Sequence, residues 1–249
     1  MRKLIVLLRL CLSFGPFYGF KVFTNVFFSN KGSIRLPSIK HPINLRLGTS
    51  DFAVFEQIFL YNEYNLKFGF EPKVIIDAGS NIGLFAIKLK NRFPDAKIIC
   101  IEPDSENFIQ LSKNLKAYEN VFLVNSGLWS HKTKLNVLDK YDQGKWGMIV
   151  EEDEQNGTID AISISDIIQI YDLKRIDVLK LDIESSEKQL FSKDYVEIFK
   201  RSKMIIVELH DWMLAGCAKT FFTALNNSLK DYSYEVSGEN TIIINNEID

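Results

Sequence analysis

The stretch Ile75-Ile-Asp-Ala-Gly-Ser-Asn-Ile-Gly83 decides the fold of this chain. Its pattern predicts the end of a buried strand, a glycine turn and the start of a helix. Gly79 allows a sharp turn and the close approach of a ligand, and Gly83 lets the helix pack tightly. Asp77 stands at the carboxyl end of the strand. The stretch therefore predicts the first strand–turn–helix unit of an α/β domain.

Strands and helices alternate from this unit to the C-terminus, which predicts a doubly wound, mostly parallel sheet. The last two strands are close enough in sequence to form a hairpin. The interval 126–165 is predicted to hold further hairpin strands, including 135–138 and 148–150. The predicted main strands are 74–77, 97–102, 121–124, 177–182, 204–209, 232–236 and 241–244, and the predicted helices are 52–61, 82–92, 104–117, 165–170, 186–195 and 219–229.

The end of the second strand carries a carboxylate, Glu102, about 20 residues after the glycine turn, where it can accept hydrogen bonds from a ribose. Dinucleotides such as NAD require G-x-G-x-x-G, so that backbone amides cradle a pyrophosphate. Here three residues, among them Asn81, separate the two glycines, and the acid Asp77 beside the turn repels phosphate. S-adenosylmethionine carries a cationic amine and a sulfonium instead of phosphate. The turn therefore favours S-adenosylmethionine, with Asn81 among the residues around it.

Acidic side chains gather at the ends of two later strands. The stretch Lys180–Glu187 (KLDIESSE) carries Asp182 and Glu184, which the period of a strand places on one face. In the following strand Glu208 and His210 share a face. Crowded carboxylates raise one another's pKa, which suits a base. Clustered carboxylates also suit a divalent ion, but no Asp-x-Asp ligand run is present, and no metal is predicted.

Five motifs together resemble the FkbM family of S-adenosylmethionine-dependent O-methyltransferases. They are IDAGSNIG, IEPD, VNSGLWS, DVLKLDIESSE and VELH, in this order over about residues 73–210. The stretch 45–59 (LRLGTSDFAVFEQIF) also resembles the leading segment of bacterial members. The resemblance implies a Rossmann-like class I methyltransferase fold with seven strands in the order 3-2-1-4-5-7-6. It also implies methylation of a hydroxyl, often on a sugar of a bacterial surface glycan or on a secondary metabolite.

The resemblance also assigns site residues. The family's D-x-E-G-x-E motif falls on Asp182, Glu184 and Glu187, with Ser185 in place of the glycine. That departure puts the close-approach role of the glycine in question, although Ser185 or Ser186 can cap the next helix, and Ser186 has capping-box spacing to Gln189. The positions that the resemblance gives to the cofactor are Asp77, Gly79 and Gly83 in the loop, Glu102 at the ribose, and Asn125 and Ser126 at the adenine.

The expected chemistry is direct transfer of a methyl group to a hydroxyl, helped by a base. Asp182 is the first candidate for the base, followed by Glu184 and His210, and Glu208 is expected to orient His210. Two tryptophans, Trp146 and Trp212, suit stacking on a sugar ring or ordinary packing equally. The alternatives are a degenerate methyltransferase fold that binds a glycan or partner without turnover and, less favoured, an NAD-dependent oxidoreductase.

The N-terminal region differs in charge from the rest. Residues 1–50 contain eight Lys or Arg and no Asp or Glu, so the remaining residues carry 30 − 8 = 22 basic against 32 acidic side chains. Two helices are predicted at 4–12 and from 17 to 28, with a break at Gly15-Pro16. Residues 1–48 are therefore expected to form a basic, apolar helical appendage, and 49–249 the S-adenosylmethionine-binding domain.

The appendage bears on partners and location. Its apolar runs are too short to span a bilayer, so the helices either pack on the body or lie in a membrane interface. The three cysteines are far apart and lack ligand spacing, which fits a reducing cytosol. We expect a cytoplasmic protein that takes a small-molecule or glycan acceptor and no nucleic acid. Peripheral contact of residues 1–30 with the inner face of the membrane is kept open, and the oligomeric state is not predicted.

Overall fold

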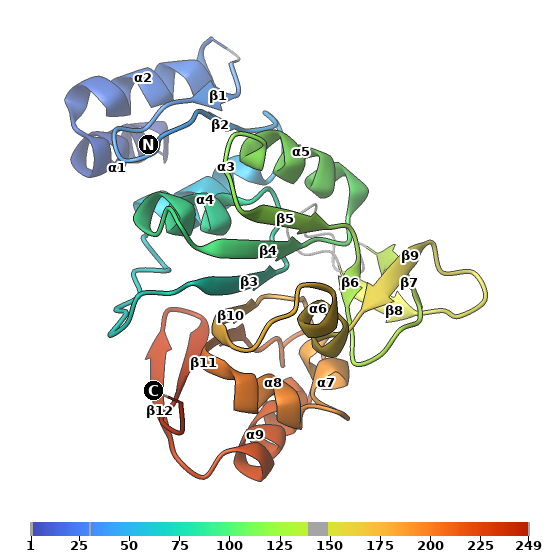
Figure 1. Cartoon of the computed structure of the whole chain (residues 1–249). Coiled ribbons are helices and arrows are strands. Elements are labelled where there is room, and N and C mark those ends of the chain that lie inside the picture. Colours follow the sequence, from blue (N-terminus) through green and yellow to red (C-terminus); the bar gives the residue numbers. More distant parts are fainter. Residues whose placement is uncertain (1, 30, 139–148, 249) are drawn as a thin grey trace.

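A computed structural model describes residues 2–29, 31–138 and 149–248 of the chain. At its centre lies a seven-stranded sheet in the order β12-β13-β11-β10-β3-β4-β5 (Figure 1). The seven strands can be numbered 1 to 7 along the chain from β3, with the strands of the separate small sheet left out. Read from β5 to β12, their order in the sheet is then 3-2-1-4-5-7-6. The strands are β3 (Val74–Ala78), β4 (Lys97–Ile101), β5 (Val121–Val124), β10 (Ile176–Leu181), β11 (Ser202–Glu208), β12 (Tyr232–Ser237) and β13 (Asn240–Asn245).

The sheet is mixed, because β13 runs antiparallel to both β11 and β12. The pairings from β11 through β10, β3 and β4 to β5 are all parallel. The final two strands form the predicted hairpin, and a hairpin necessarily reverses one strand. Five adjacent parallel strands place five carboxyl ends along one edge of the sheet, which is where a ligand site is expected.

Helices cover both faces of the sheet, so the predicted doubly wound α/β architecture is confirmed (Figure 1). Successive strand residues point to opposite faces, and Ile75 and Ile76 accordingly join different core clusters. Ile75 packs with α4 (Leu84–Arg92) and α5 (Ser105–Leu115). On the other face, Ile76 belongs to the cluster formed by the helices α6 (Ile164–Ile170), α8 (Val196–Arg201) and α9 (Cys217–Ser228).

A four-stranded sheet in the order β6-β9-β7-β8 projects from the domain at the right of Figure 1. The antiparallel pair of β7 and β8 confirms the predicted hairpin strands, whereas the pairing of β6 with β9 was not foreseen. Trp146, a candidate for sugar stacking, lies outside the described residues. The strands are β6 (Gly127–Leu128), β7 (Lys134–Leu138), β8 (Ile149–Glu152) and β9 (Ile159–Ile162).

Two helix predictions need correction. The helix predicted over 186–195 is instead a short α7 (Glu187–Leu190), followed by a turn and α8. The side chain of Ser186 makes no capping hydrogen bond, so the predicted capping box is absent. The short helix α6 begins one residue earlier than predicted, because Ser163 and Asp166 form its capping box. The N-cap of α5 is Asp104, which accepts a 2.8 Å hydrogen bond from the backbone amide of Asn107 in the first turn.

The N-terminal segment forms the two predicted helices, α1 (Arg2–Phe14) and α2 (Pro16–Phe27), with the break at Gly15. They cross closely, because a Cβ on Gly19 would lie 2.5 Å from the backbone nitrogen of Cys11. Buried side chains of both helices, including Leu10, belong to the core cluster that contains α4. Next come β1 (Ser33–Ile34), β2 (Ile43–Asn44), α3 (Asp51–Phe55) and the π-helix η1 (Glu56–Leu60), so the helix predicted over 52–61 changes type halfway.

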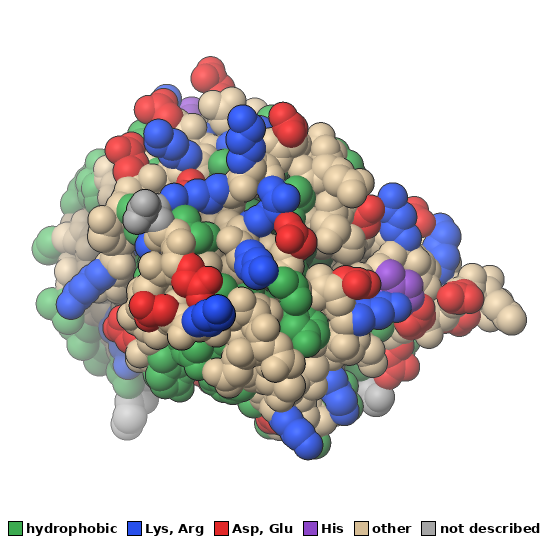
Figure 2. All heavy atoms as spheres, turned by 60° about the horizontal axis from the view of Figure 1, so that its bottom comes forward, with side chains coloured by type: hydrophobic (Ala, Val, Ile, Leu, Met, Phe, Trp, Pro, Cys, Tyr) green, Lys and Arg blue, Asp and Glu red, His purple; other side chains and the backbone are tan. Residues whose placement is uncertain are grey.

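Two surface properties bear on the predicted partners. Among the described residues, no helix has the length and apolar character that crossing a membrane requires. On the face of the molecule in Figure 2, basic and acidic side chains are interspersed. A surface that tracks nucleic acid gathers basic side chains on one face or along one helix. The face in Figure 2 therefore gives no support to nucleic-acid binding.

Candidate active site

A cavity opens at the carboxyl ends of β3, β4, β10 and β11, where the sequence predicts the site. The π-helix η1 and the small sheet supply further parts of its wall. Charged side chains on the wall are mostly acidic, with Lys180 as the one cation among its described residues. The predicted site residues on the wall are Gly79, Asn81, Glu102, Asp182, Glu184 and Glu208.

The turn after β3 is built as the sequence predicts. Gly79 has a φ of 73°, and a Cβ at this position would lie 1.7 Å from the carbonyl oxygen of Asp182. Only glycine allows β10 to come so close to the turn. A Cβ on Gly83 would lie 2.7 Å from a side-chain carbon of Leu111, so this glycine brings α4 against α5. Gly79 thus lies on the cavity wall, whereas Gly83 is not on the wall and acts through the packing of α4.

Glu102 reaches back from the end of β4 and holds the same turn. Its Oε2 accepts a 2.8 Å hydrogen bond from the backbone amide of Asn81, and its Oε1 accepts one of 3.0 Å from that of Asp104. Glu102 is only 5% exposed, and burial raises the pKa of its carboxyl to about 7. It lies on the cavity wall, at the end of the second strand of the fold, which is the position of a ribose acceptor.

The two residues assigned to the adenine lie beside the cavity rather than on its wall. The Asn125 side chain donates a 2.8 Å hydrogen bond to the carbonyl of Glu102 and so braces the end of β4. Ser126 is buried. The next two residues, Gly127 and Leu128, are on the wall and begin the small sheet. The loop after β5 therefore reaches the cavity wall one or two residues after Asn125 and Ser126, and its contact with adenine stays a prediction.

Asp77 is fully buried below the cavity and is not part of its wall. It lies opposite Lys180 in the parallel pairing of β3 with β10, and its Oδ1 is 3.5 Å from Lys180 Nζ. Burial raises the pKa of the Asp77 carboxyl, and Lys180 partly offsets this effect. Asp77 was expected to attract a cationic ligand directly, but it forms a buried ion pair with Lys180 instead.

Lys180 ties the two strand ends together. Its Nζ donates to the carbonyl oxygen of Gly79 at 2.9 Å and to Oδ2 of Asp182 at 3.2 Å. Burial opposes the charge of Lys180, but Asp182, Tyr64 and Asp77 outweigh that effect and raise the pKa of its ammonium well above the usual value. Lys180 is therefore always positively charged, and its charge holds the ends of β3 and β10 together.

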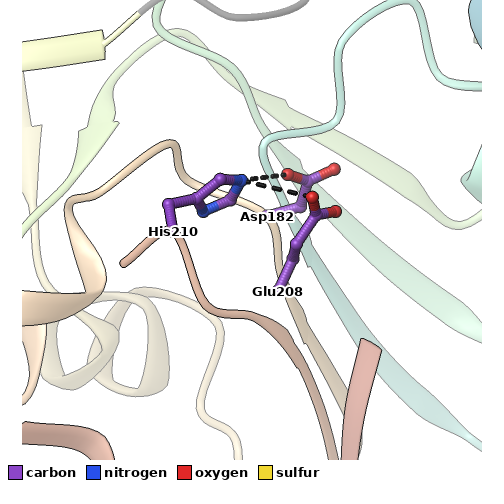
Figure 3. A group of neighbouring side chains, drawn as sticks. All are labelled: Asp182, Glu208 and His210. Atoms are coloured by element: carbon purple, nitrogen blue, oxygen red, sulfur yellow. Dashed lines mark ion pairs between the residues drawn. The ribbon is translucent and has the colours of Figure 1, made fainter. Parts of the chain in front are cut away.

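His210 lies at the centre of a group of carboxylates (Figure 3). Its Nε2 is 3.3 Å from Glu184, 3.4 Å from Glu208 and 3.8 Å from Asp182. Its Nδ1 is 2.9 Å from Oε1 of Glu187. Burial favours the neutral ring, but the surrounding acids outweigh it and raise the pKa of His210 to about 12. His210 is therefore an imidazolium at neutral pH, which makes it the least suited of the three candidates for the base.

The residue that orients His210 is Glu187. The sequence interpretation gave this role to Glu208, but Glu208 faces Nε2 while Glu187 holds Nδ1. Glu187 is fully buried, so its carboxylate depends on the imidazolium beside it for a counter-charge. Its position in the motif was recognised, but its partner was not. The partner depends on the turn between β10 and α7, which has no periodic pattern.

Glu184 has the titration that a base at neutral pH requires. Burial and the charge of Asp182 raise the pKa of Glu184 to about 8, although His210 acts in the opposite direction. The strand β10 ends at Leu181, and Glu184 has a φ of 48°, so the predicted alternation does not extend to it. Asp182 and Glu184 do meet at His210, but the turn brings them together rather than the strand period.

Ser185, which stands where the family has glycine, has a φ of 76°. This left-handed conformation costs a serine about 1 kcal/mol relative to glycine. We therefore expect Ser185→Gly to raise the free energy of unfolding by about 0.5–1 kcal/mol, measured by urea denaturation. Ser192→Gly is the matched control, because Ser192 has a negative φ and should lose stability. If Ser185→Gly lowers the free energy of unfolding as much as Ser192→Gly does, backbone strain at Ser185 is contradicted.

Several wall residues escaped the sequence interpretation. Gln57 comes from η1, and Tyr64 from the loop that follows it. Ser186 Oγ is buried on the wall without a hydrogen-bond partner, which marks it as a contact for a polar ligand. These residues lie in loops and short helices, where sequence periodicity gives no signal. A π-helix is rare and often occurs at functional sites, so η1 fits this position.

Two groups of described side chains come close enough to share a metal ion. Asp182, Glu208 and His210 offer ligand atoms within 4.8 Å of one another, and so do Glu63, Glu208 and Glu239. The proton on His210 competes with a metal for Nε2 in the first group. The expectation of a metal-free site stays a prediction.

A family model described as the methyltransferase FkbM domain matches residues 77–236. The chain belongs to the FkbM methyltransferase family. The match begins at Asp77, covers the glycine turn and the acidic cluster around His210, and ends within β12. The predicted family membership and the general activity of a methyltransferase are therefore confirmed.

Named methyltransferases are similar to this FkbM-family chain. "Methyltransferase 1" of Beauveria bassiana is 24% identical over 200 residues, covering 66% of this chain and 80% of its own. "Methyltransferase sdnD" of Sordaria araneosa is 26% identical over 189 residues, covering 62% and 73%. The crystal structure of the methyltransferase FkbM from Methylobacillus flagellatus KT has a TM-score of 0.53 at 16% identity. The match covers 76% of this chain but only 47% of that structure, so it supports the fold alone.

Proposed function

We propose that this FkbM-family methyltransferase uses S-adenosylmethionine to methylate a hydroxyl, on a sugar of a bacterial surface glycan or on a secondary metabolite. The observation that carries the proposal is Glu184, a carboxyl on the cavity wall with a pKa of about 8. A neutral hydroxyl becomes a good nucleophile only as its proton leaves. A base whose pKa lies near the working pH is the group that this reaction needs.

The residues on the wall fit S-adenosylmethionine. Glu102 stands at the strand end that receives ribose, and Gly79 keeps the turn free of a side chain. Acidic side chains on the wall attract the cationic amine and sulfonium of this cofactor and repel the pyrophosphate of NAD. Lys180 is not available to bind a phosphate, because its ammonium is already bound to Asp182 and the carbonyl of Gly79. When bound, S-adenosylmethionine supplies an electrophilic methyl group.

The protein's part is to bind, align and deprotonate. In the proposed mechanism Glu184 accepts the proton of the acceptor hydroxyl. Asp182, which lies between Lys180 and His210, fixes the two cations and faces the cavity. Glu187 holds the ring of His210, so that the imidazolium keeps the carboxylates in one place. The sequence ranked Asp182 first as base, and the pKa of Glu184 near neutrality reverses that order.

A direct test is transfer of an isotope-labelled methyl group from S-adenosylmethionine to candidate glycans and hydroxylated metabolites. Label should appear on an oxygen of the acceptor, as mass spectrometry of the product locates it. Label on nitrogen or carbon would contradict O-methylation. Binding of cofactor without transfer to any member of a broad acceptor panel would favour the alternative of a degenerate, glycan-binding fold.

The rate should depend on pH in a defined way. The pKa values of Glu102 and Glu184 are raised to about 7 and about 8, so both carboxyls hold protons at acid pH. We expect kcat/KM, which reports groups of the free enzyme, to rise as the pH passes through 7 to 8 and then to level off. His210 keeps its proton until about pH 12, so it adds no descending limb below pH 10. A profile that is flat from pH 6 to 9 would contradict the assignment of Glu184.

A further inference from the structure

The helix α1 is apolar on two opposite faces. Val6 and Leu10 are 5% and 0% exposed and point into the core. Leu4, Leu8 and Leu12, which share a face at intervals of four residues, are 61%, 55% and 86% exposed. A surface helix normally turns a polar face outward, so three exposed leucines in a row leave α1 without a partner on that face.

The helix α2 repeats this arrangement with aromatic side chains. Val22 and Phe23 are buried, whereas Phe17, Phe20 and Phe28 are 72%, 59% and 71% exposed. Phe17 and Phe20 lie three residues apart on one side of α2, and Phe28 follows directly after the helix ends at Phe27. Both helices therefore carry exposed apolar side chains, and together with Phe28 they form the α1–α2 hairpin (residues 2–28).

Basic side chains are interleaved with this apolar surface. The ammonium of Lys3 lies 5.7 Å from the ring centre of Phe28, and that of Lys21 lies 6.0 Å from that of Phe17. Residues 1–50 contain eight basic and no acidic side chains. Four of the eight basic residues, Arg2, Lys3, Arg9 and Lys21, belong to the hairpin, so its partner must accept both apolar side chains and positive charges. The charge complementarity points to an anionic surface.

We propose that the α1–α2 hairpin docks this protein on an anionic lipid surface, where both helices lie in the plane of the membrane interface. The helices have 13 and 12 residues, or roughly 20 Å each, and so are too short to span a bilayer. Helices in the interface insert Leu and Phe among the acyl chains and set Lys and Arg against the headgroups. A second copy of this chain fits less well, because it would bring two basic surfaces together.

Docking would place the cavity close to the membrane. The guanidinium of Arg9 in α1 donates a 2.6 Å hydrogen bond to the hydroxyl of Tyr61, directly after η1. The same π-helix supplies Gln57 and Ile58 to the wall of the cavity. The hairpin therefore contacts the segment that borders the site, without contributing a residue to the site itself.

Sedimentation of the full chain with lipid vesicles tests the proposal. The protein should bind vesicles of phosphatidylglycerol at least tenfold more tightly than vesicles of phosphatidylcholine, and added salt should reduce the difference. The triple variant Leu8→Ser/Leu12→Ser/Phe17→Ser should weaken binding to phosphatidylglycerol more than tenfold. These side chains are exposed, so the variant should keep its fold.

Two further variants separate the contributions. Lys3→Gln/Lys21→Gln should weaken binding to phosphatidylglycerol about 30-fold, because each of the two basic side chains near the surface contributes about 1 kcal/mol. Ile109→Ser/Ile170→Ser, which removes apolar side chains of 67% and 63% exposure elsewhere, should bind like the natural chain. No binding to phosphatidylglycerol, or equal binding by the triple variant, would overturn the proposal. So would a dimer in light scattering that the triple variant dissociates.

Discussion

Replacing Glu184 by Gln should lower kcat by about 10²–10⁴-fold and leave the affinity for S-adenosylhomocysteine essentially unchanged. The amide keeps the size of the side chain and its contact with His210, but it cannot accept the proton of a hydroxyl. Burial and the charge of Asp182 give Glu184 its pKa of about 8, and no neutral side chain reproduces that property. The measurement is turnover with labelled cofactor, alongside calorimetric titration of the cofactor product.

Asp182→Asn separates the two candidate bases. This variant should also lose activity, because Asp182 binds Lys180 at 3.2 Å and aligns the strand ends. Its residual rate should still rise with pH, but at lower pH than in the natural enzyme, because the charge of Asp182 no longer raises the pKa of Glu184. The residual rate of Glu184→Gln should lose this step and keep only the step near pH 7 that Glu102 gives. Glu235→Gln, at an exposed position in β12, is the control and should be fully active. Full turnover by Glu184→Gln would remove it as the base and restore Asp182 to that role.

Replacing Lys180 by Met should lower the free energy of unfolding by about 3–5 kcal/mol. The ammonium is the cation that faces the fully buried Asp77, at 3.5 Å, and it also binds the carbonyl of Gly79. Methionine has a similar length but leaves the carboxylate of Asp77 without a counter-charge in the core. The cost of such an unpaired charge is larger than the value of most single contacts.

The double variant Asp77→Asn/Lys180→Met tests the cause. Removing both charges should recover a large part of the stability, because no buried charge then remains unpaired. Lys200→Met, at an exposed position of α8, should change the stability by less than about 0.5 kcal/mol. Urea denaturation measures these three variants and the single variant Asp77→Asn. If the double variant loses as much stability as Asp77→Asn and Lys180→Met together, the buried pair is not the source of the loss.

The fold was predictable because its signals are local and repeated. The glycine turn at Gly79, the apolar strands and the capped helices each follow a rule of spacing that holds over a few residues. Ile75 and Ile76 then divide between the two faces of the sheet without further information. The split of the helix after Ser186 was not predictable, because tertiary packing decides it.

The positions of those site residues that lie at strand ends were predictable. Glu102, Asp182 and Glu208 end neighbouring parallel strands or follow them directly, so the topology alone brings them to one edge. Their roles were not predictable, because they depend on burial and on the left-handed turn at Glu184. The buried pair of Asp77 with Lys180, and the hold of Glu187 on His210, both exist only in three dimensions.

The central claim is that the cavity is an S-adenosylmethionine site, and calorimetric titration of the purified chain with S-adenosylhomocysteine and with NAD tests it most directly. We expect one equivalent of S-adenosylhomocysteine to bind, with NAD giving no heat of binding. Glu102→Gln should weaken that binding, because Glu102 is the proposed acceptor for the ribose hydroxyls, and Glu235→Gln should not. Binding of NAD in preference to S-adenosylhomocysteine, or equal affinity in the Glu102→Gln variant, would contradict the assignment of the site.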